Sequence, residues 1–221
     1  MTRPKAVVPV GLTAVIFDLD GVLVDSFQVM RQAFSVAYSE IVGLQDAPFD
    51  EYRRHMGMYF PEIMRAMGLP AELEGPFVRE SRRLSNQVTV YAGVQEMLLA
   101  LRDSGLRLAI ATGKSGSRAR SLLETVGLLG DFDSVIGSDE VAAPKPAPDI
   151  ILRALERLGA EARDAIMVGD APVDLQSAHA AGVFAAAALW GEADPAQLQL
   201  SIPDAILDRP ADVVALCLPR P

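Results

Sequence analysis

Residues 14–26 read AVIFDLDGVLVDS, and this stretch decides the fold. It opens with a short apolar run rich in β-branched side chains, which is typical of a buried parallel strand. Asp18 and Asp20 follow the strand directly, and alternation along a strand brings positions i and i+2 out on the same side. Two like charges placed together cost free energy unless a cation or a proton compensates them. The stretch therefore predicts a charged site at a sheet edge, with capping or turn acids as the alternative.

Apolar runs alternate with helical patterns over most of the remaining chain. The predicted strands are Leu12–Phe17, Leu106–Ala111, Ser134–Ile136, Ala165–Val168 and Val183–Leu189. The predicted helices between them are Val94–Arg102, Ser117–Val126, Asp149–Leu158 and Leu175–Ala181. This alternation predicts an α/β fold with a doubly wound, mainly parallel, Rossmann-like sheet. In such a sheet the carboxyl ends of the strands form the ligand crevice.

Residues 27–87 interrupt this alternation. They contain no convincing apolar β run, and their pattern predicts helices at Phe27–Ile41, Phe49–Met56, Pro61–Met67 and Pro76–Leu84. We therefore expect an inserted all-helical cap at 27–87 and a Rossmann-like core made of residues 1–26 and 88–221. The two linkers, near Asp25 and Val88–Gly93, are expected to act as hinges that open and close the cap.

Composition excludes several classes of protein. The 221 residues include 20 basic and 29 acidic side chains and no basic block, so nucleic-acid binding is not expected. The single cysteine, Cys217, rules out an internal disulfide and a Cys-based metal site, and we expect it to be a buried structural thiol. Two histidines are too few for a His-rich metal site. Any divalent cation must therefore be held by oxygen ligands, which favours Mg²⁺.

No membrane or secretory segment is predicted. Arg3 and Lys5 precede an apolar run, but Pro9 and Gly11 interrupt it and it leads straight into the acidic pair. A buried strand explains this run better than a secretory signal does. No apolar stretch is long enough to span a bilayer. We expect a cytoplasmic protein.

A second segment, AIATGKS at residues 109–115, combines a strand with the start of a helix. Thr112 offers a hydroxyl and Gly113 a free backbone N–H, and both groups bind phosphoryl oxygens at such positions. A simple helix cap is the alternative. The letters GKS also occur in nucleotide-binding loops, but the upstream glycine of that motif is missing, so we reject a nucleotide site.

Two further segments add charged side chains. In APKPAPD, residues 143–149, prolines flank Lys145 and fix its backbone, with an exposed loop lysine as the alternative. In IMVGDAPVD, residues 166–174, Asp170 stands at a strand end and Asp174 near the start of the next helix. Acids from two strands, with a lysine and a threonine from two others, predict a cation site beside an anion site. Phosphoryl transfer requires that combination.

In this order and spacing the four segments resemble the four motifs of the haloacid dehalogenase superfamily. The resemblance spans nearly the whole chain, and the helical insert resembles that superfamily's smaller cap type. It implies that Asp18 is a nucleophile, and that Asp20 protonates the leaving oxygen and later activates water. It implies that Thr112 and Lys145 hold the phosphoryl oxygens. Lys145 would also reduce repulsion between Asp18 and the phosphate.

The resemblance also implies a metal site and a reaction. Asp18, the backbone carbonyl of Asp20, and Asp170 would bind Mg²⁺, with Asp174 supporting them. The superfamily's dehalogenases lack the acid found here at position 20, and its transport ATPases carry Thr there. An alkoxide leaving group needs a proton whereas a halide does not, so position 20 favours a phosphatase or a phosphomutase.

The cap is expected to select the substrate. Within residues 51–57, EYRRHMG, the side chains of Arg53, Arg54 and His55 are candidates to meet a substrate carboxylate or hydroxyl. A solvated basic helix end is the alternative. β-Phosphoglucomutases are similar, but their cap supplies a lysine and residues 27–87 contain none. A phosphatase is therefore favoured over a mutase.

The expected substrate is a small phosphorylated metabolite. Residues 51–70 and 111–123 resemble phosphatases associated with 3-amino-5-hydroxybenzoate biosynthesis, and the chain is also similar to phosphoglycolate phosphatases. These resemblances imply a phosphorylated sugar or aminosugar, or a phosphoglycolate-like acid. We expect a monomer or a homodimer. A sugar phosphomutase and a non-catalytic binding module are the remaining alternatives.

Overall fold

A computed structural model describes residues 9, 11–43, 46–191 and 194–218 of the protein. Its strands are β1 (Ala14–Phe17), β2 (Val24–Asp25), β3 (Thr89–Val90), β4 (Arg107–Thr112), β5 (Ser134–Gly137), β6 (Ala165–Gly169), β7 (Phe184–Ala188) and β8 (Ala205–Leu207). Six of them form one sheet in the order β5-β4-β1-β6-β7-β8, and every neighbouring pair is parallel. The chain winds outward from β1 in both directions, so the topological switch lies beside β1. Ligands of such sheets bind there.

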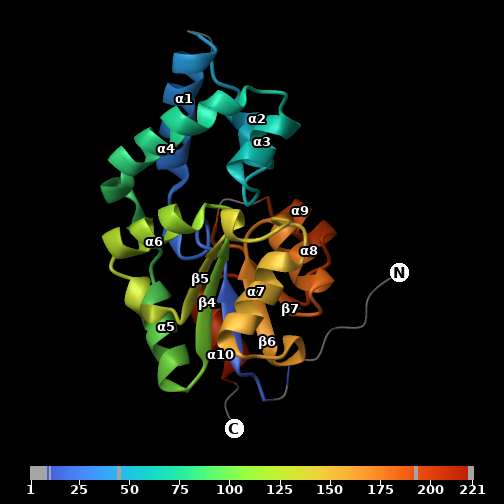
Figure 1. The fold of residues 1–221 in the computed structure, drawn as a ribbon. Coiled ribbons are helices and arrows are strands. Elements are labelled where there is room, and N and C mark those ends of the chain that lie inside the picture. The colour runs from blue at the N-terminus through green and yellow to red at the C-terminus, as the bar shows by residue number, and fades with distance from the viewer. Residues whose placement is uncertain (1–8, 10, 44–45, 192–193, 219–221) are drawn as a thin grey trace.

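Ten α-helices surround or extend this sheet within the described residues (Figure 1). They are α1 (Phe27–Ile41), α2 (Phe49–Arg54), α3 (Phe60–Ala66), α4 (Glu74–Arg83), α5 (Val94–Asp103), α6 (Gly116–Thr125), α7 (Asp149–Leu158), α8 (Pro172–Ala180), α9 (Pro195–Leu200) and α10 (Pro210–Cys217). Short 3₁₀ turns connect several of them.

Both faces of the sheet are buried. On β1, Val15 and Phe17 contribute to a core shared with α5, α6 and α10, while Ala14 and Ile16 face a second core with α7, α8 and α9. Alternate side chains of one strand thus enter two different cores, which is why β1 is apolar at every position. The predicted doubly wound parallel sheet is confirmed.

The helices α1–α4 form a separate lobe beyond the carboxyl ends of the strands (Figure 1). An aromatic cluster forms its centre, where Phe34 stacks on Tyr52 at 4.6 Å between ring centroids and Phe60 on Phe77 at 4.2 Å. The chain enters and leaves the lobe through an antiparallel ribbon, in which β2 pairs with β3. We propose that residues 27–87 form the helical cap that the sequence predicts.

Several elements differ from the sequence predictions. The helix expected at Leu175–Ala181 begins earlier, because Pro172 suits the first turn, where no backbone N–H is needed. Strand β8 and helices α9 and α10 were not predicted, and each is short. Cys217 lies buried in α10, as predicted, and burial raises the pKa of its thiol to about 12. Arg3 and Lys5 lie outside the described residues. Among the described helices, none combines the length and the apolar character that a membrane crossing requires.

Candidate active site

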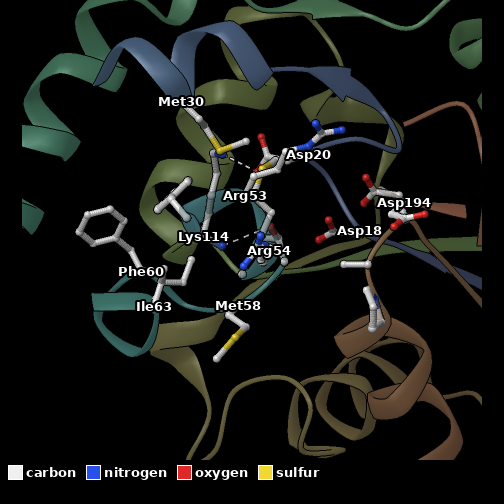
Figure 2. A pocket seen from close by; sticks show the side chains of 18 of the residues that line it. Asp18, Asp20, Met30, Arg53, Arg54, Met58, Phe60, Ile63, Lys114 and Asp194 are labelled. Carbon is white, nitrogen blue, oxygen red and sulfur yellow. Dashed lines mark hydrogen bonds and ion pairs between the residues drawn. The ribbon is translucent and has the colours of Figure 1, made fainter. Parts of the chain in front are cut away.

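A cavity of about 580 Å³ lies between the lobe and the carboxyl ends of the strands (Figure 2). The sheet side contributes Asp18, Asp20, Thr112, Gly113, Lys114 and Asp170. The lobe contributes Arg53, Arg54, Met56, Gly57, Met58 and Phe60, among others. This volume falls within the range of small-molecule sites, roughly 300–1,000 Å³. Three of the four predicted segments line this cavity, whereas Lys145 of the fourth does not line it and joins the site through its contact with Asp18.

Asp18 is buried at the end of β1 and touches a buried lysine. Lys145 Nζ donates to Asp18 Oδ1 at 3.0 Å and to Asp174 Oδ1 at 2.6 Å, and both Lys145 and Asp174 have no exposed surface. The backbone N–H of Ala171 donates to the other oxygen of Asp174 at 3.0 Å. Asp174 therefore fixes Lys145, and Lys145 fixes Asp18.

Burial dominates the electrostatics of Asp18. It raises the pKa of Asp18 to about 7; Lys145 counteracts this effect, and the charges of Asp174 and Asp20 add to it. Burial alone would lower the pKa of Lys145, but Asp174 and Asp18 reverse the sign and hold it above its ordinary value. Lys145 is therefore a cation whose charge is shared by two acids.

Asp20 has a different environment. Its two carboxylate oxygens accept hydrogen bonds from the Ser26 hydroxyl and the Lys114 ammonium. Burial opposes ionisation, but Lys114 and Ser26 outweigh burial and hold the pKa of Asp20 below its usual range. Asp18 and Asp20 thus sit two residues apart with their pKa values pushed in opposite directions, a pattern found where two carboxyls take different roles.

Asp170 completes a cluster of acids. Ligand oxygens of Asp18, Asp170 and Asp174 all lie within 4.8 Å of one another. Burial raises the pKa of Asp170 well above its usual range, and the charges of Asp18 and Asp174 raise it further. Lys145 supplies a single positive charge among the three buried carboxylates. The donor set consists of hard oxygen ligands whose negative charge Lys145 offsets only in part, and it therefore fits a Mg²⁺ ion.

A glycine makes the approach of Asp170 possible. Gly21 has a φ of +77°, and a Cβ at this position would come within 2.0 Å of Asp170 Oδ2. Any other residue would be strained by the backbone angle and would displace the carboxylate. The turn after Asp20 therefore requires Gly21.

Thr112 and Gly113 lie at the end of β4, next to the lobe. Lys114 N–H donates to Thr112 Oγ1 at 3.3 Å, and Ser138 Oγ donates to the Thr112 carbonyl at 3.0 Å. A Cβ on Gly113 would come within 2.5 Å of the Gly57 carbonyl oxygen. The lobe and the core therefore meet backbone to backbone at these two glycines.

Of the three cap residues predicted to select substrate, two line the cavity. Arg53 and Arg54 face it from the end of α2, and Arg53 also lies 5.4 Å from the centroid of the Phe27 ring. His55 ends the helix, and it is not among the residues that line the cavity.

Sequence reasoning did not identify two basic residues of the site, Lys114 and Arg118. Both line the cavity. Lys114 lies two residues after Thr112, the last residue of β4, so it emerges at the same edge of the sheet as the predicted site residues. Arg118 lies in the first turn of α6, where a cation opposes the helix dipole and no acid compensates it. A residue that departs from this preference of helix ends indicates a functional role.

Replacing Asp170 with asparagine tests the cation site. Without Mg²⁺ and at about pH 8, Asp170→Asn is expected to unfold a few degrees above the wild type. An acid whose pKa is higher in the folded than in the unfolded protein destabilises the fold once the pH exceeds its unfolded pKa. The difference in melting temperature between the variant and the wild type should therefore shrink towards about pH 4. Excess Mg²⁺ should raise the melting temperature of the wild type and leave that of the variant unchanged. Equal Mg²⁺ shifts in both proteins would contradict the assignment.

The fold and the site together define a class: a Rossmann-like enzyme with a buried acid at the end of its first strand and a helical lobe over the cavity. The chain belongs to the haloacid dehalogenase-like hydrolase family, whose model matches residues 15–188. The predicted membership and the prediction of a hydrolase are thereby confirmed.

Relatives and solved structures agree with this assignment. The chain is 37% identical over 213 residues to a protein named "Probable phosphatase IndB" from Dickeya dadantii, covering 90% of this chain and 91% of the relative. It is 31% identical to a phosphoglycolate phosphatase from Aquifex aeolicus, covering 93% and 96%. The crystal structure of a hydrolase from Pseudomonas syringae superposes with a TM-score of 0.81 at 26% identity, covering 91% of this chain and 96% of that one.

Proposed function

We propose that this protein is a Mg²⁺-dependent phosphatase that hydrolyses a small phosphomonoester through a phospho-aspartyl intermediate on Asp18. The observation that carries the proposal is the pairing of two acids in one cavity, with Asp18 fixed by Lys145 and Asp20 held separately by Lys114 and Ser26. The phosphatase names of the relatives support the same reaction.

In the first half-reaction a carboxylate oxygen of Asp18 attacks phosphorus, and the bond from phosphorus to the ester oxygen breaks. Asp20 gives its proton to that oxygen, so that an alcohol leaves. The Lys114 contact favours the ionised form of Asp20 in the free enzyme. Asp20 must therefore take up a proton and part from Lys114 before this step.

In the second half-reaction Asp20 acts as a base. It accepts a proton from a water molecule whose oxygen attacks phosphorus, and the bond between phosphorus and Asp18 breaks. Inorganic phosphate leaves and the Asp18 carboxylate is restored. We assign the phosphoryl oxygens to Thr112, Gly113 and Lys145, and Lys145 also holds Asp18 in place and offsets its charge.

Asp18, Asp170 and the backbone carbonyl of Asp20 are the groups that we propose for Mg²⁺, with Asp174 bracing them through Lys145 and the Ala171 N–H. When bound, the ion would neutralise negative charge on the transferring phosphoryl group. A cation held by Asp18 would also favour the ionised form of this carboxyl, whose pKa burial raises to about 7.

We propose water as the acceptor of the phosphoryl group. The lysine that a phosphoglucomutase cap supplies has no counterpart in residues 27–87, where the basic residues lining the cavity are Arg53 and Arg54. A phosphorylated sugar or aminosugar, a phosphoglycolate-like acid and a link to 3-amino-5-hydroxybenzoate biosynthesis stay predictions for the substrate.

Phosphate release over a panel of esters tests the proposal. Phosphorylated sugars, aminosugars, short carboxylic acids and aryl phosphates should be compared with Mg²⁺ and with EDTA. We expect Mg²⁺-dependent release of inorganic phosphate from at least one class and none with EDTA. Isomerisation of a hexose phosphate with little free phosphate would identify a mutase instead. Mg²⁺ binding without turnover of any ester would identify a binding module.

A further inference from the structure

The lobe side of the cavity carries an apolar wall beside the charged side chains of Asp50, Arg53 and Arg54. The side chains that form it are Met30, Met56, Met58, Phe60, Ile63 and Phe77. In Figure 2, Phe60 and Ile63 lie on one side of the cavity and Asp18 on the opposite side, with Lys114 between them. Methionine and aromatic side chains bind carbon-rich groups and adapt to their shape. A two-carbon acid phosphate has no apolar surface to place against this wall.

A cation from the core reaches the same cavity. The side chain of Arg118 is partly buried, donates to Ser81 Oγ at 3.1 Å, and its guanidinium carbon lies 5.2 Å from the centroid of the Phe77 ring. Both partners are uncharged side chains of α4 in the lobe. Lys114 and Lys145, by contrast, each contact a carboxylate. Over the part of the chain that the structure describes, no ion pair joins Arg118 to an acid.

A guanidinium that is partly removed from water without a contacting anion is costly, because it gives up hydration and gains no ion pair in return. Burial lowers the pKa of Arg118, and the nearby Tyr52, Asp20 and Glu74 offset only part of that effect. The Ser81 hydroxyl and one ring face occupy only part of its five donors. Arg118 lines the cavity, where a planar anion would satisfy its remaining N–H groups.

Resting on the proposed function, we infer that the substrate is a phosphomonoester with an apolar, ring-sized body and a carboxylate, and that Arg118 binds the carboxylate. The phosphoryl group would lie at Asp18, the body against the apolar wall, and the carboxylate at the guanidinium. A carboxylate, with one negative charge, matches the single charge of Arg118 better than a second phosphoryl group does. Arg118 is thus a residue that determines specificity.

Three esters test this inference: meta-carboxyphenyl phosphate, phenyl phosphate and phosphoglycolate. We expect the wild type to show a kcat/KM for the carboxyphenyl ester roughly 10- to 100-fold above that for phenyl phosphate, as one charge-assisted hydrogen-bonded contact provides. Phosphoglycolate, which has the carboxylate without the ring, should also fall below the carboxyphenyl ester.

The variant Arg118→Met should remove the preference between the two aryl esters, mostly by raising KM for the carboxylated one. Arg118→Lys should restore part of it. Arg120→Met is the matched control, because Arg120 lies on the same helix but is directed to Glu140 and does not line the cavity. The control should keep the wild-type preference.

The outcomes separate a substrate contact from a structural one. If Arg118→Met lowered kcat/KM equally for both aryl esters, Arg118 would serve to dock the lobe, and the inference would be overturned. The inference would equally fail if the wild type did not discriminate between the esters, or if the variant kept the preference. Absence of phosphate release from every ester of the broad panel would overturn the proposed function itself.

Discussion

The variant Asp18→Asn is expected to release phosphate at least on the order of 10⁴-fold more slowly than the wild type, the loss seen when a covalent nucleophile is removed. An amide keeps the shape of the side chain but cannot form the acyl phosphate. The measurement is phosphate release under saturating ester, with intact-protein mass spectrometry of acid-quenched samples. The wild type should show a phosphoryl adduct, and the variant none.

The fold of this variant should survive. Lys145 retains Asp174 as a partner, and one of three crowded carboxylates is removed. The melting temperature without Mg²⁺ should therefore be no lower than that of the wild type. Asp20→Asn is the informative companion: it should slow turnover while still forming the adduct from an ester with a good leaving group. Full activity in Asp18→Asn would refute the nucleophile assignment.

The second large effect is expected on stability. Lys145→Met removes the ammonium that Asp18 and Asp174 share and leaves two buried carboxylates without it. Breaking a buried ion pair in this way costs roughly 3–5 kcal/mol of unfolding free energy. Urea unfolding in EDTA measures this difference. Lys114→Met is the matched control and should cost less, because Asp20 keeps its hydrogen bond from Ser26 and neither side chain of that pair is fully buried.

The loss in Lys145→Met should depend on pH with a defined sign. In the wild type the folded pKa of Asp18 is about 7, above its ordinary value of 3.8, so ionising it costs stability as pH rises between these values. Without Lys145 the folded pKa of Asp18 rises further and that cost grows. The variant should therefore lose most at about pH 8 and least at about pH 5. A loss independent of pH would show that the packing of the lysine stem, and not its charge, matters.

The sequence predicted the fold where local pattern and burial coincide. Helices at Phe27–Ile41 and Asp149–Leu158 match the structure at both ends. In the second case Gly159, with a φ of +59°, ends the helix in the left-handed region. Strand β8 could not be predicted, since three residues of mixed exposure at a sheet edge carry no periodic signal.

The same contrast holds for the candidate site. Asp18, Thr112 and Asp170 follow apolar strands, and parallel strands deliver their ends to one edge, so their meeting was predictable. The partners of these residues were not. That Lys145 bridges two acids and that Arg118 turns into the cavity depend on side-chain directions fixed by tertiary packing, which no spacing along the chain encodes. His55 illustrates the same limit, since it stands beside two residues that line the cavity and does not line it itself.

Because Gly57 and Gly113 approach each other, the placement of the lobe and the choice of substrate depend on different atoms. This contact joins main-chain atoms of the lobe and of the turn after β4, so it does not depend on which side chains the lobe carries. Nearby side chains such as Met58 and Phe60 can therefore be exchanged, so that a different ester fits, without altering this backbone contact. We expect a few side-chain exchanges in the lobe to change the range of substrates. Laboratory evolution should leave Gly57 and Gly113 unchanged.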